Sequence, residues 1–302
     1  MSPAAVTTEN LTKRYGERTV VDDVNLCVPA GCVYGFLGPN GSGKSTTMKM
    51  LLSLVRPTGG EVRIMGRAMT RRTRTELLGS IGSLIESPPG YAHLTGAENM
   101  RVVQRMLDLD RPQVDWAIDA VRLRDHLDRK LREYSLGMKQ RLGIAMALAR
   151  RPALLILDEP TNGLDPAGIE EMRILLRRLA NGGVTVLVSS HLLGEVDRTA
   201  DALGILSEGR LIFQGTRAQL LAASTPDVVI ACTDPRAATA ALAAHGAHAI
   251  ANGEVSVPGI DDHATARVVA RLVGEGIGIH GVRREEQSLE DVFLRLTAGG
   301  AL

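Results

Sequence analysis

The sequence predicts an α/β protein with a mainly parallel sheet, an antiparallel β flank, a helical region and a smaller C-terminal α/β domain. Apolar runs such as ALLILDEP (153–160) and VTVLVSSH (184–191) have the length and composition of strands buried in a parallel sheet. Stretches with helical apolar spacing alternate with these runs, as they do in α/β folds. A glycine-rich loop, GPNGSGKST at 38–46, joins a strand directly to a helix.

The N-terminal part of the chain predicts the antiparallel flank and the first strands of the sheet. We expect strands at 6–15, 19–28 and 31–38, a helix at 46–55, and strands at 61–66 and 81–86. A turn at Pro29–Gly31 separates the second strand from the third, which runs straight into the glycine loop. The flank therefore precedes the loop in the chain.

A mostly helical region is predicted at about 87–150. Thr95 and Glu98 have the spacing of a capping box at its first helix, and a long helix at 137–151 ends before Pro152. After the strand at 153–160, Asp165 and Pro166 predict the cap and first residue of another helix. The strand at 184–191 and a hairpin that turns at Glu208–Gly209 complete this part of the chain.

The stretch AASTPD at 222–227 predicts a boundary, which gives domains at 1–222 and 223–302. Beyond it we expect a small α/β domain whose elements follow one another in the order strand, helix, strand, helix, strand, and a final helix. The ranges are 228–233, 235–245, 254–259, 263–274, 277–283 and 288–297.

Composition excludes several classes of protein. The formal net charge is only +1, which argues against a nucleic-acid partner because no overall basic field exists. Cys27, Cys32 and Cys232 lack metal-ligand spacing and fall on predicted strands, which favours buried, reduced thiols and a cytosolic protein. No signal peptide is recognisable, and no apolar run approaches the roughly 18 residues of a membrane span. We expect any work at a membrane to require docking onto a separate spanning protein.

The glycine loop matches G-x-x-x-x-G-K-[ST] between a strand and a helix, the pattern of a P-loop NTPase. Gly38, Gly41 and Gly43 let backbone N–H groups surround phosphate oxygens. Lys44 supplies a charge to the β- and γ-phosphates, and the Ser45 hydroxyl is a ligand for Mg²⁺. The residues expected to hold the nucleotide are Gly38, Pro39, Asn40, Gly41, Ser42, Gly43, Lys44, Ser45 and Thr46. The alternative, a glycine turn before an ordinary helix, does not explain the lysine and serine.

Two carboxylates end the strand at 153–160. Asp158 is placed to hold Mg²⁺, and Glu159 is a candidate general base that activates water against the γ-phosphate. The alternative for Glu159 is a turn cap before Pro160.

Between these motifs lies YSLGMKQR at 134–141, which resembles the LSGGQxQR signature of ABC transporter ATPase subunits. Ser135, Gly137, Gln140 and Arg141 match the signature, whereas Tyr134, Leu136 and Met138 depart from it. The resemblance implies a head-to-tail dimer in which Ser135, Gly137 and Gln140 of one subunit close on the ATP of the other. The alternative is a capped amphipathic helix.

Further matches extend the resemblance over residues 5 to about 220, with five motifs in family order. Tyr15 lies where the family stacks an aromatic ring on adenine, although a tyrosine after a strand is usually a packing residue. Gly163, Leu164 and Asp165 resemble the loop that crosses the dimer, and Asp165 also fits a plain helix cap. His191 matches the histidine that contacts the γ-phosphate.

Glu86 is the informative departure, because most of the family has glutamine there. A glutamate at this position resembles the bacitracin-resistance and lantibiotic-immunity exporters, and implies that Glu86 contacts Mg²⁺ or its water. The alternative is a solvated loop residue. The C-terminal domain and its last helix resemble the extension of daunorubicin-type drug exporters.

These features together imply an ATPase that uses ATP and Mg²⁺ to power an exporter of antibiotics, peptides or drugs. The implied partners are a membrane permease and a second ATPase subunit, expected to be an identical chain, and the implied location is the inner face of the cell membrane. The main alternative function is that of an importer or of a lipid or polysaccharide exporter. A soluble ABC ATPase acting on nucleic acid or ribosomes should carry paired cassettes or a long insertion, but only about 90 residues separate Lys44 from Ser135. A P-loop kinase or GTPase should lack the signature.

Overall fold

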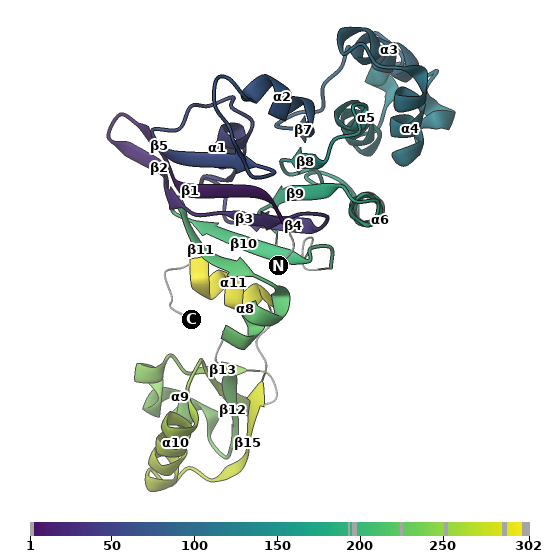
Figure 1. Cartoon of the computed structure of the whole chain (residues 1–302). Coiled ribbons are helices and arrows are strands. Elements are labelled where there is room, and N and C mark those ends of the chain that lie inside the picture. The colour runs from purple at the N-terminus through teal and green to yellow at the C-terminus, as the bar shows by residue number, and fades with distance from the viewer. Residues whose placement is uncertain are drawn as a thin grey trace. The chain divides into compact units, whose positions relative to one another are not determined.

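The computed structural model describes residues 3–192, 194, 198–223, 226–250, 253–285 and 289–297. The chain divides into two compact units, Met1–Arg217 and Ala218–Leu302. The first unit contains two sheets with several helices, and the second contains one small sheet with its own helices (Figure 1).

A six-stranded sheet forms the centre of the first unit, in the order β11-β10-β4-β9-β8-β7. Its strands are β4 (Val33–Leu37), β7 (Ile81–Leu84), β8 (Leu154–Leu157), β9 (Thr185–Ser190), β10 (Ala202–Ser207) and β11 (Arg210–Gly215). Neighbouring strands from β10 to β7 are parallel, and β11 alone runs antiparallel to its neighbour. The predicted hairpin at the end of this unit is therefore confirmed, as is the α/β fold class.

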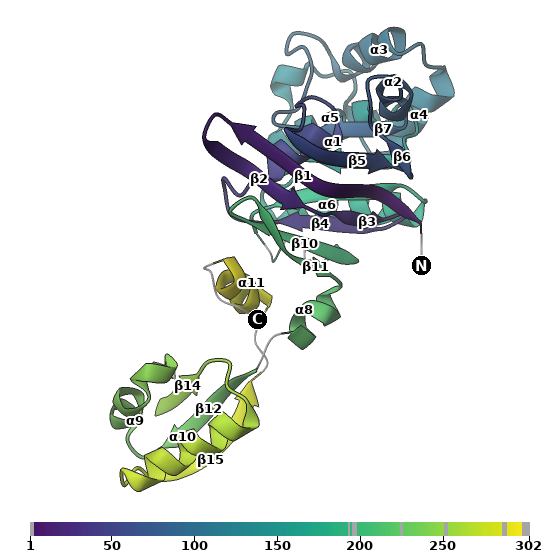
Figure 2. The ribbon, with the colours of Figure 1, turned by 60° about the vertical axis from the view of Figure 1, so that its left-hand side comes forward.

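The predicted antiparallel flank is a separate sheet. It consists of β1 (Ala4–Tyr15), β2 (Arg18–Val24), β3 (Cys27–Pro29), β5 (Gly59–Ile64) and β6 (Arg67–Ala68). All of its strand pairs are antiparallel. Figure 2 shows this sheet lying against the central one, with β1 and β5 above β4 and β10.

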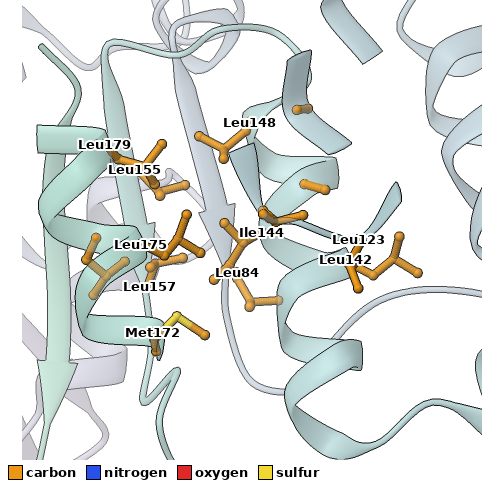
Figure 3. Packing of buried hydrophobic residues seen from close by; sticks show 14 of the residues in the cluster. Leu84, Leu123, Leu142, Ile144, Leu148, Leu155, Leu157, Met172, Leu175 and Leu179 are labelled. Atoms are coloured by element: carbon orange, nitrogen blue, oxygen red, sulfur yellow. The ribbon is translucent and has the colours of Figure 1, made fainter. Parts of the chain in front are cut away.

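Alternation along the central strands directs side chains to two apolar clusters on opposite faces of the central sheet. On β8, Leu155 and Leu157 belong to one cluster, whereas Leu154 and Ile156 belong to the other. The second cluster also contains residues of the antiparallel sheet and of α1 (Lys44–Leu51), so it joins the two sheets. Figure 3 shows the first cluster, in which side chains of α5 (Leu136–Leu148) and α6 (Pro166–Asn181) point toward those of β7 and β8.

The predicted helical region comprises α3 (Gly96–Met106), α4 (Arg111–Ala120), two short 3₁₀ turns (Arg124–His126 and Leu131–Glu133) and α5. The expected capping box is present: Thr95 Oγ1 accepts from the Glu98 amide at 3.2 Å, and the Thr95 amide donates to Glu98 Oε2 at 2.7 Å. The predicted cap at Asp165 is also present, because its Oδ1 accepts from the Gly168 amide at 3.2 Å. Two further short helices are α2 (Arg74–Gly79) in the first unit and α8 (Arg217–Ala223), which begins at the boundary between the units.

The second unit has the connectivity of a ferredoxin-like β-α-β-β-α-β fold. Its elements are β12 (Asp227–Cys232), α9 (Pro235–Ala241), a 3₁₀ turn (Ala243–His245), β13 (His248–Ile250), β14 (Glu254–Val257), α10 (Asp262–Gly274) and β15 (Ile279–Glu285), followed by α11 (Leu289–Thr297). The strand order is β13-β14-β12-β15, and every pair is antiparallel. Side chains of α9 and α10 pack on Val228, Ile230 and Val255 of the sheet.

Four local predictions were wrong. The strand expected at 19–28 is two strands, β2 and β3, separated by Asn25 and Leu26. The strand expected at 81–86 ends at Leu84, because Glu86 has a left-handed backbone with φ of 71° that a strand cannot contain. The strand β13 was missed, since its three residues in an alanine-rich stretch give no period to detect. Only Cys232 is a buried thiol; Cys27 is exposed on the short strand β3, and Cys32 is partly buried in the turn before β4.

Candidate nucleotide-binding site

The glycine loop leaves β4 and ends at α1, as the motif requires. Gly43 caps α1 with φ of 107°, and a Cβ there would lie 2.7 Å from the Val20 carbonyl oxygen. A Cβ on Gly38 would lie 2.3 Å from the Leu206 carbonyl oxygen. Both positions therefore exclude a side chain, so the backbone folds tightly and its N–H groups stay accessible for an anion. The loop is also tied to the hairpin turn, where the Gly209 amide donates to the Ser42 carbonyl oxygen at 3.0 Å.

Lys44 is 5% exposed and lies under this loop. Its ammonium donates to the carbonyl oxygens of Gly38 at 2.7 Å and Pro39 at 3.2 Å. The ammonium also lies 3.7 Å from Glu159 Oε1. Burial lowers the pKa of Lys44, and the charges of Glu159 and Asp158 oppose that shift. The lysine is thus held between loop carbonyls and a carboxylate, where an anionic ligand can draw on its charge.

The Glu159 carboxylate contacts two side chains, Lys44 and His191. One carboxylate oxygen lies near Lys44, and the other lies 2.7 Å from His191 Nδ1. Glu159 follows β8 with a left-handed φ of 49°, and its amide donates to Ser189 Oγ at 2.9 Å. A non-glycine residue in this conformation is uncommon and is held by its surroundings. The structure therefore brings together the three residues that the sequence predicts to be catalytic.

Asp158 is buried at the end of β8, 7% exposed. Ser189 Oγ donates to its Oδ1 at 2.5 Å, which fixes one carboxylate oxygen. Among the described residues no group of three or more His, Cys, Asp or Glu side chains could by itself enclose a metal ion. Mg²⁺ is usually held by one or two protein ligands together with phosphates and waters, so Asp158 and Ser45 fit that ion.

The loop, β8 and β9 open on one cavity of about 410 Å³. Its lining residues are Tyr15, Arg18, Val20, Asn40, Gly41, Gly43, Lys44, Ser45, Thr46, Glu159, Asn162 and His191. Tyr15 is 51% exposed at the rim, and Lys13 Nζ lies 4.7 Å from the centre of its ring. An exposed aromatic face beside a phosphate loop suits a nucleotide base.

Glu86 does not line this cavity. Its carboxylate is 68% exposed and lies 2.5 Å from Lys49 Nζ on α1. The hydrogen bond and charge of Lys49 lower the pKa of Glu86. The predicted contact of Glu86 with Mg²⁺ stays a prediction.

The signature residues lie elsewhere, at a second cavity of about 520 Å³. Ser135, Gly137 and Asp165 line it, together with Leu136 and Leu164. Ser135 is the N-cap of α5, and its Oγ accepts from the Met138 amide at 3.2 Å. The structure thus keeps these three predicted nucleotide contacts away from the glycine loop of the same chain.

Gln140 lines neither cavity. It is buried within α5, and in the described part of the chain its Oε1 has no hydrogen-bond partner. Its predicted contact with nucleotide stays a prediction.

Sequence reasoning missed four residues of the site: Ser189, which holds Asp158 and Glu159; Lys49, which pairs with Glu86; and Arg18 and Asn162 at the cavity wall. A usable signal existed for Lys49, because lysine is rare in this chain. Two of its five lysines lie on the helix that follows the loop.

The ABC transporter family model matches residues 21–162, which include the glycine loop, the signature and both carboxylates after β8. The bacitracin transport ATP-binding protein BcrA of Enterococcus faecalis is 38% identical over 302 residues, which cover 98% of this chain and 97% of that protein. This chain belongs to the ABC transporter ATP-binding family. It therefore has the activity of that family, hydrolysis of ATP to power transport.

The family assignment agrees with further comparisons. The daunorubicin/doxorubicin resistance ATP-binding protein DrrA of Streptomyces peucetius is 35% identical, with 97% of this chain and 92% of that protein covered. The solved structure of cbiO1 from Clostridium perfringens, part of an ABC transporter complex, has a TM-score of 0.67 and 27% identity over 73% of this chain and 92% of that one. The exporter resemblance inferred from the motifs is thereby confirmed. No helix in the described ranges is long and apolar enough to cross a membrane.

Proposed function

We propose that this ABC ATPase powers the export of antibiotics, peptides or drugs through a separate membrane permease. The observation that supports it best is the similarity to BcrA, which extends over 98% of the chain and so beyond the ATPase unit. DrrA is similar over nearly the same length. Both are resistance or transport proteins for antibiotics by name, so the cargo class of this chain is inferred from theirs.

In the proposed reaction the glycine loop and Lys44 bind the phosphates of ATP. Lys44 can exchange its carbonyl partners and Glu159 for phosphate oxygens, because all of them lie within 3.7 Å of its ammonium. Glu159 then accepts a proton from the attacking water, and His191, 2.7 Å away, orients that carboxylate. Bound Mg²⁺, held by Ser45 and Asp158, would neutralise charge on the phosphates.

We further propose that two copies of the chain assemble into composite sites. Ser135 and Gly137 lie at the N-terminus of α5, which favours an anion, yet their own chain's phosphate loop lines a different cavity. A second copy placed head to tail would bring a phosphate group to that helix end. The dimer would dock on the permease at the inner face of the membrane.

Transport into inverted membrane vesicles tests the proposed function. Vesicles that contain the permease and this chain should accumulate a labelled cargo antibiotic when ATP is added, whereas vesicles with Lys44→Ala should not. Hydrolysis by the chain without ATP-dependent accumulation of bacitracin-like peptides or anthracyclines would contradict the cargo class. Accumulation in right-side-out vesicles instead would indicate an importer.

Cargo export by the Glu86→Ala variant can be measured in the same vesicles. We expect Glu86→Ala to bind ATP within about tenfold of wild type, about 1.4 kcal/mol, because Glu86 lies outside the cavity wall. The same variant should lose most cargo export, since Glu86 lies between β7 and the helical region that is proposed to face the permease. Full export by Glu86→Ala would leave Glu86 without a role in coupling.

A further inference from the structure

Lys49 and Glu86 form an ion pair at the edge of the nucleotide site. Their charged atoms lie 2.5 Å apart, although the residues are 37 positions apart in the sequence. Lys49 lies on α1, five residues after Lys44. At 3.6 residues per turn the two lysines point about 140° apart, so the helix sends one ammonium under the loop and the other toward Glu86.

The backbone places Glu86 beside the carboxylates that follow β8. Strands β7 and β8 are parallel, with Leu84 opposite Leu157, and the Asp158 amide donates to the Leu84 carbonyl oxygen at 2.9 Å. Glu86 and Glu159 both stand two residues beyond the end of their strand, with φ of 71° and 49°. Two adjacent strand ends therefore present three carboxylates to the side of the sheet where phosphates are expected to bind.

Each of these carboxylates has its own partner. Glu159 has Lys44 and His191, Asp158 has the Ser189 hydroxyl, and Glu86 has Lys49. Among the described side chains, the acidic partners of lysine are Glu159 for Lys44 and Glu86 for Lys49, and the other acid–base pairs use arginine or, once, histidine.

We propose that Lys49 is the counter-ion that allows this site to carry glutamate at position 86, and that it holds the Glu86 carboxylate away from the phosphates of ATP. The proposal rests on the proposed ATP-binding function of the site. A glutamine at this position would be neutral and would need no counter-ion. Lys49 is a positioning residue, since it acts on the nucleotide through Glu86.

The charge of Glu86 matters most when no Mg²⁺ offsets the phosphate charge. Without Lys49, the free carboxylate should repel metal-free ATP more strongly than Mg²⁺–ATP. Because the Lys49 side chain is 31% exposed and that of Glu86 68%, solvent screens the pair and the effect should be moderate.

Binding of trinitrophenyl-ATP to the full-length chain tests the proposal, with one titration in excess EDTA and one in excess Mg²⁺. We expect Lys49→Met to raise the Kd about tenfold in EDTA and by a smaller factor in Mg²⁺. Lys49→Met/Glu86→Gln should return to within about twofold of wild type, as should Glu86→Gln and Lys49→Arg alone. Lys130→Met, which removes an exposed lysine of the helical region, is the matched control.

A loss in Lys49→Met that persists in the double variant would overturn the proposal, because it would assign Lys49 a packing role in α1. Equal Kd values for Lys49→Met and wild type in EDTA would overturn it as well. Lys49→Gln provides a second neutral variant if Lys49→Met does not fold, which fluorescence of the single tryptophan, Trp116, would report. If wild type itself fails to bind the analogue in Mg²⁺, the proposed nucleotide site is at fault rather than the role of Lys49.

Discussion

Replacing Glu159 by glutamine is expected to lower ATP turnover about 10²- to 10⁴-fold while leaving ATP binding nearly unchanged. Glutamine has the size of glutamate and can keep a hydrogen bond to His191, 2.7 Å from the carboxylate. It cannot accept a proton from water at neutral pH, so only the chemical step is lost. Steady-state phosphate release and equilibrium nucleotide binding, measured on the same preparation, separate the two effects.

If the proposed dimer forms, the Glu159→Gln variant should also change the oligomeric state. If hydrolysis is what releases two subunits from each other, Glu159→Gln should accumulate as ATP-bound dimers in size-exclusion chromatography. Glu208→Gln is a matched control, because Glu208 also has a left-handed backbone, with φ of 47°, but is exposed at the turn between β10 and β11. Turnover at the wild-type rate in Glu159→Gln would remove Glu159 from the role of general base.

The sequence predicts those parts of the fold whose signals are local. The capping box of Thr95 and Glu98, the cap at Asp165 and the hairpin turn at Glu208–Gly209 involve neighbours within three residues, and all three are present. The apolar runs of β8 and β9 identify buried strands because both faces of the sheet are covered.

The parts of the site that were missed depend on contacts between distant residues. Ser189 and Asp158 are 31 positions apart, and no spacing rule predicts that one hydroxyl will serve two carboxylate-bearing residues of the next strand. The outward turn of Glu86 depends on where β7 stops, which is set by backbone conformation rather than by the apolar pattern of 81–86. Pairing and burial are tertiary properties, so they override local periodicity.

The expectation that Ser135 acts on the nucleotide of a second chain comes from the resemblance to ABC transporters. Neither the sequence pattern nor the geometry of one chain predicts it. Lys44 and Ser135 line two different cavities of one chain, and nothing in their spacing says that they act on the same nucleotide. Leu136 is a position at which this chain departs from the family signature. It replaces a signature glycine, and a Cβ on Gly163 would lie only 3.0 Å from its Cδ2, so the signature of this chain packs closely on its own 163–165 loop.

The composite site predicts the second large effect. Lys44→Ala removes the buried ammonium of the glycine loop, and Ser135→Arg places a long cation at the mouth of the second cavity. Each variant alone is expected to be nearly inactive, since every dimer would contain the same defect at both sites. Ser135→Ala removes the hydroxyl that caps α5, at a cost of about 1 kcal/mol, without adding a cation, so it shows how much of the Ser135→Arg effect comes from the arginine itself.

Mixing the two inactive proteins should restore part of the ATPase activity. In a mixed dimer, the intact glycine loop of the Ser135→Arg chain faces the intact signature of the Lys44→Ala chain, while the opposite site carries both defects. Activity should therefore rise as the mixture approaches equal amounts and vanish in either pure protein. A mixture of Lys44→Ala with the double variant Lys44→Ala/Ser135→Arg has no complete site and should stay inactive. If mixed dimers form, as shown by pull-down through a tag on one chain, and activity still does not return, there are two explanations. Either the sites are not shared between subunits, or both sites must be intact for either to hydrolyse ATP. Recovery, in contrast, requires that Ser135 act on the nucleotide bound by the other chain, which is the contact that the proposed composite site predicts for residues lining two different cavities of one chain.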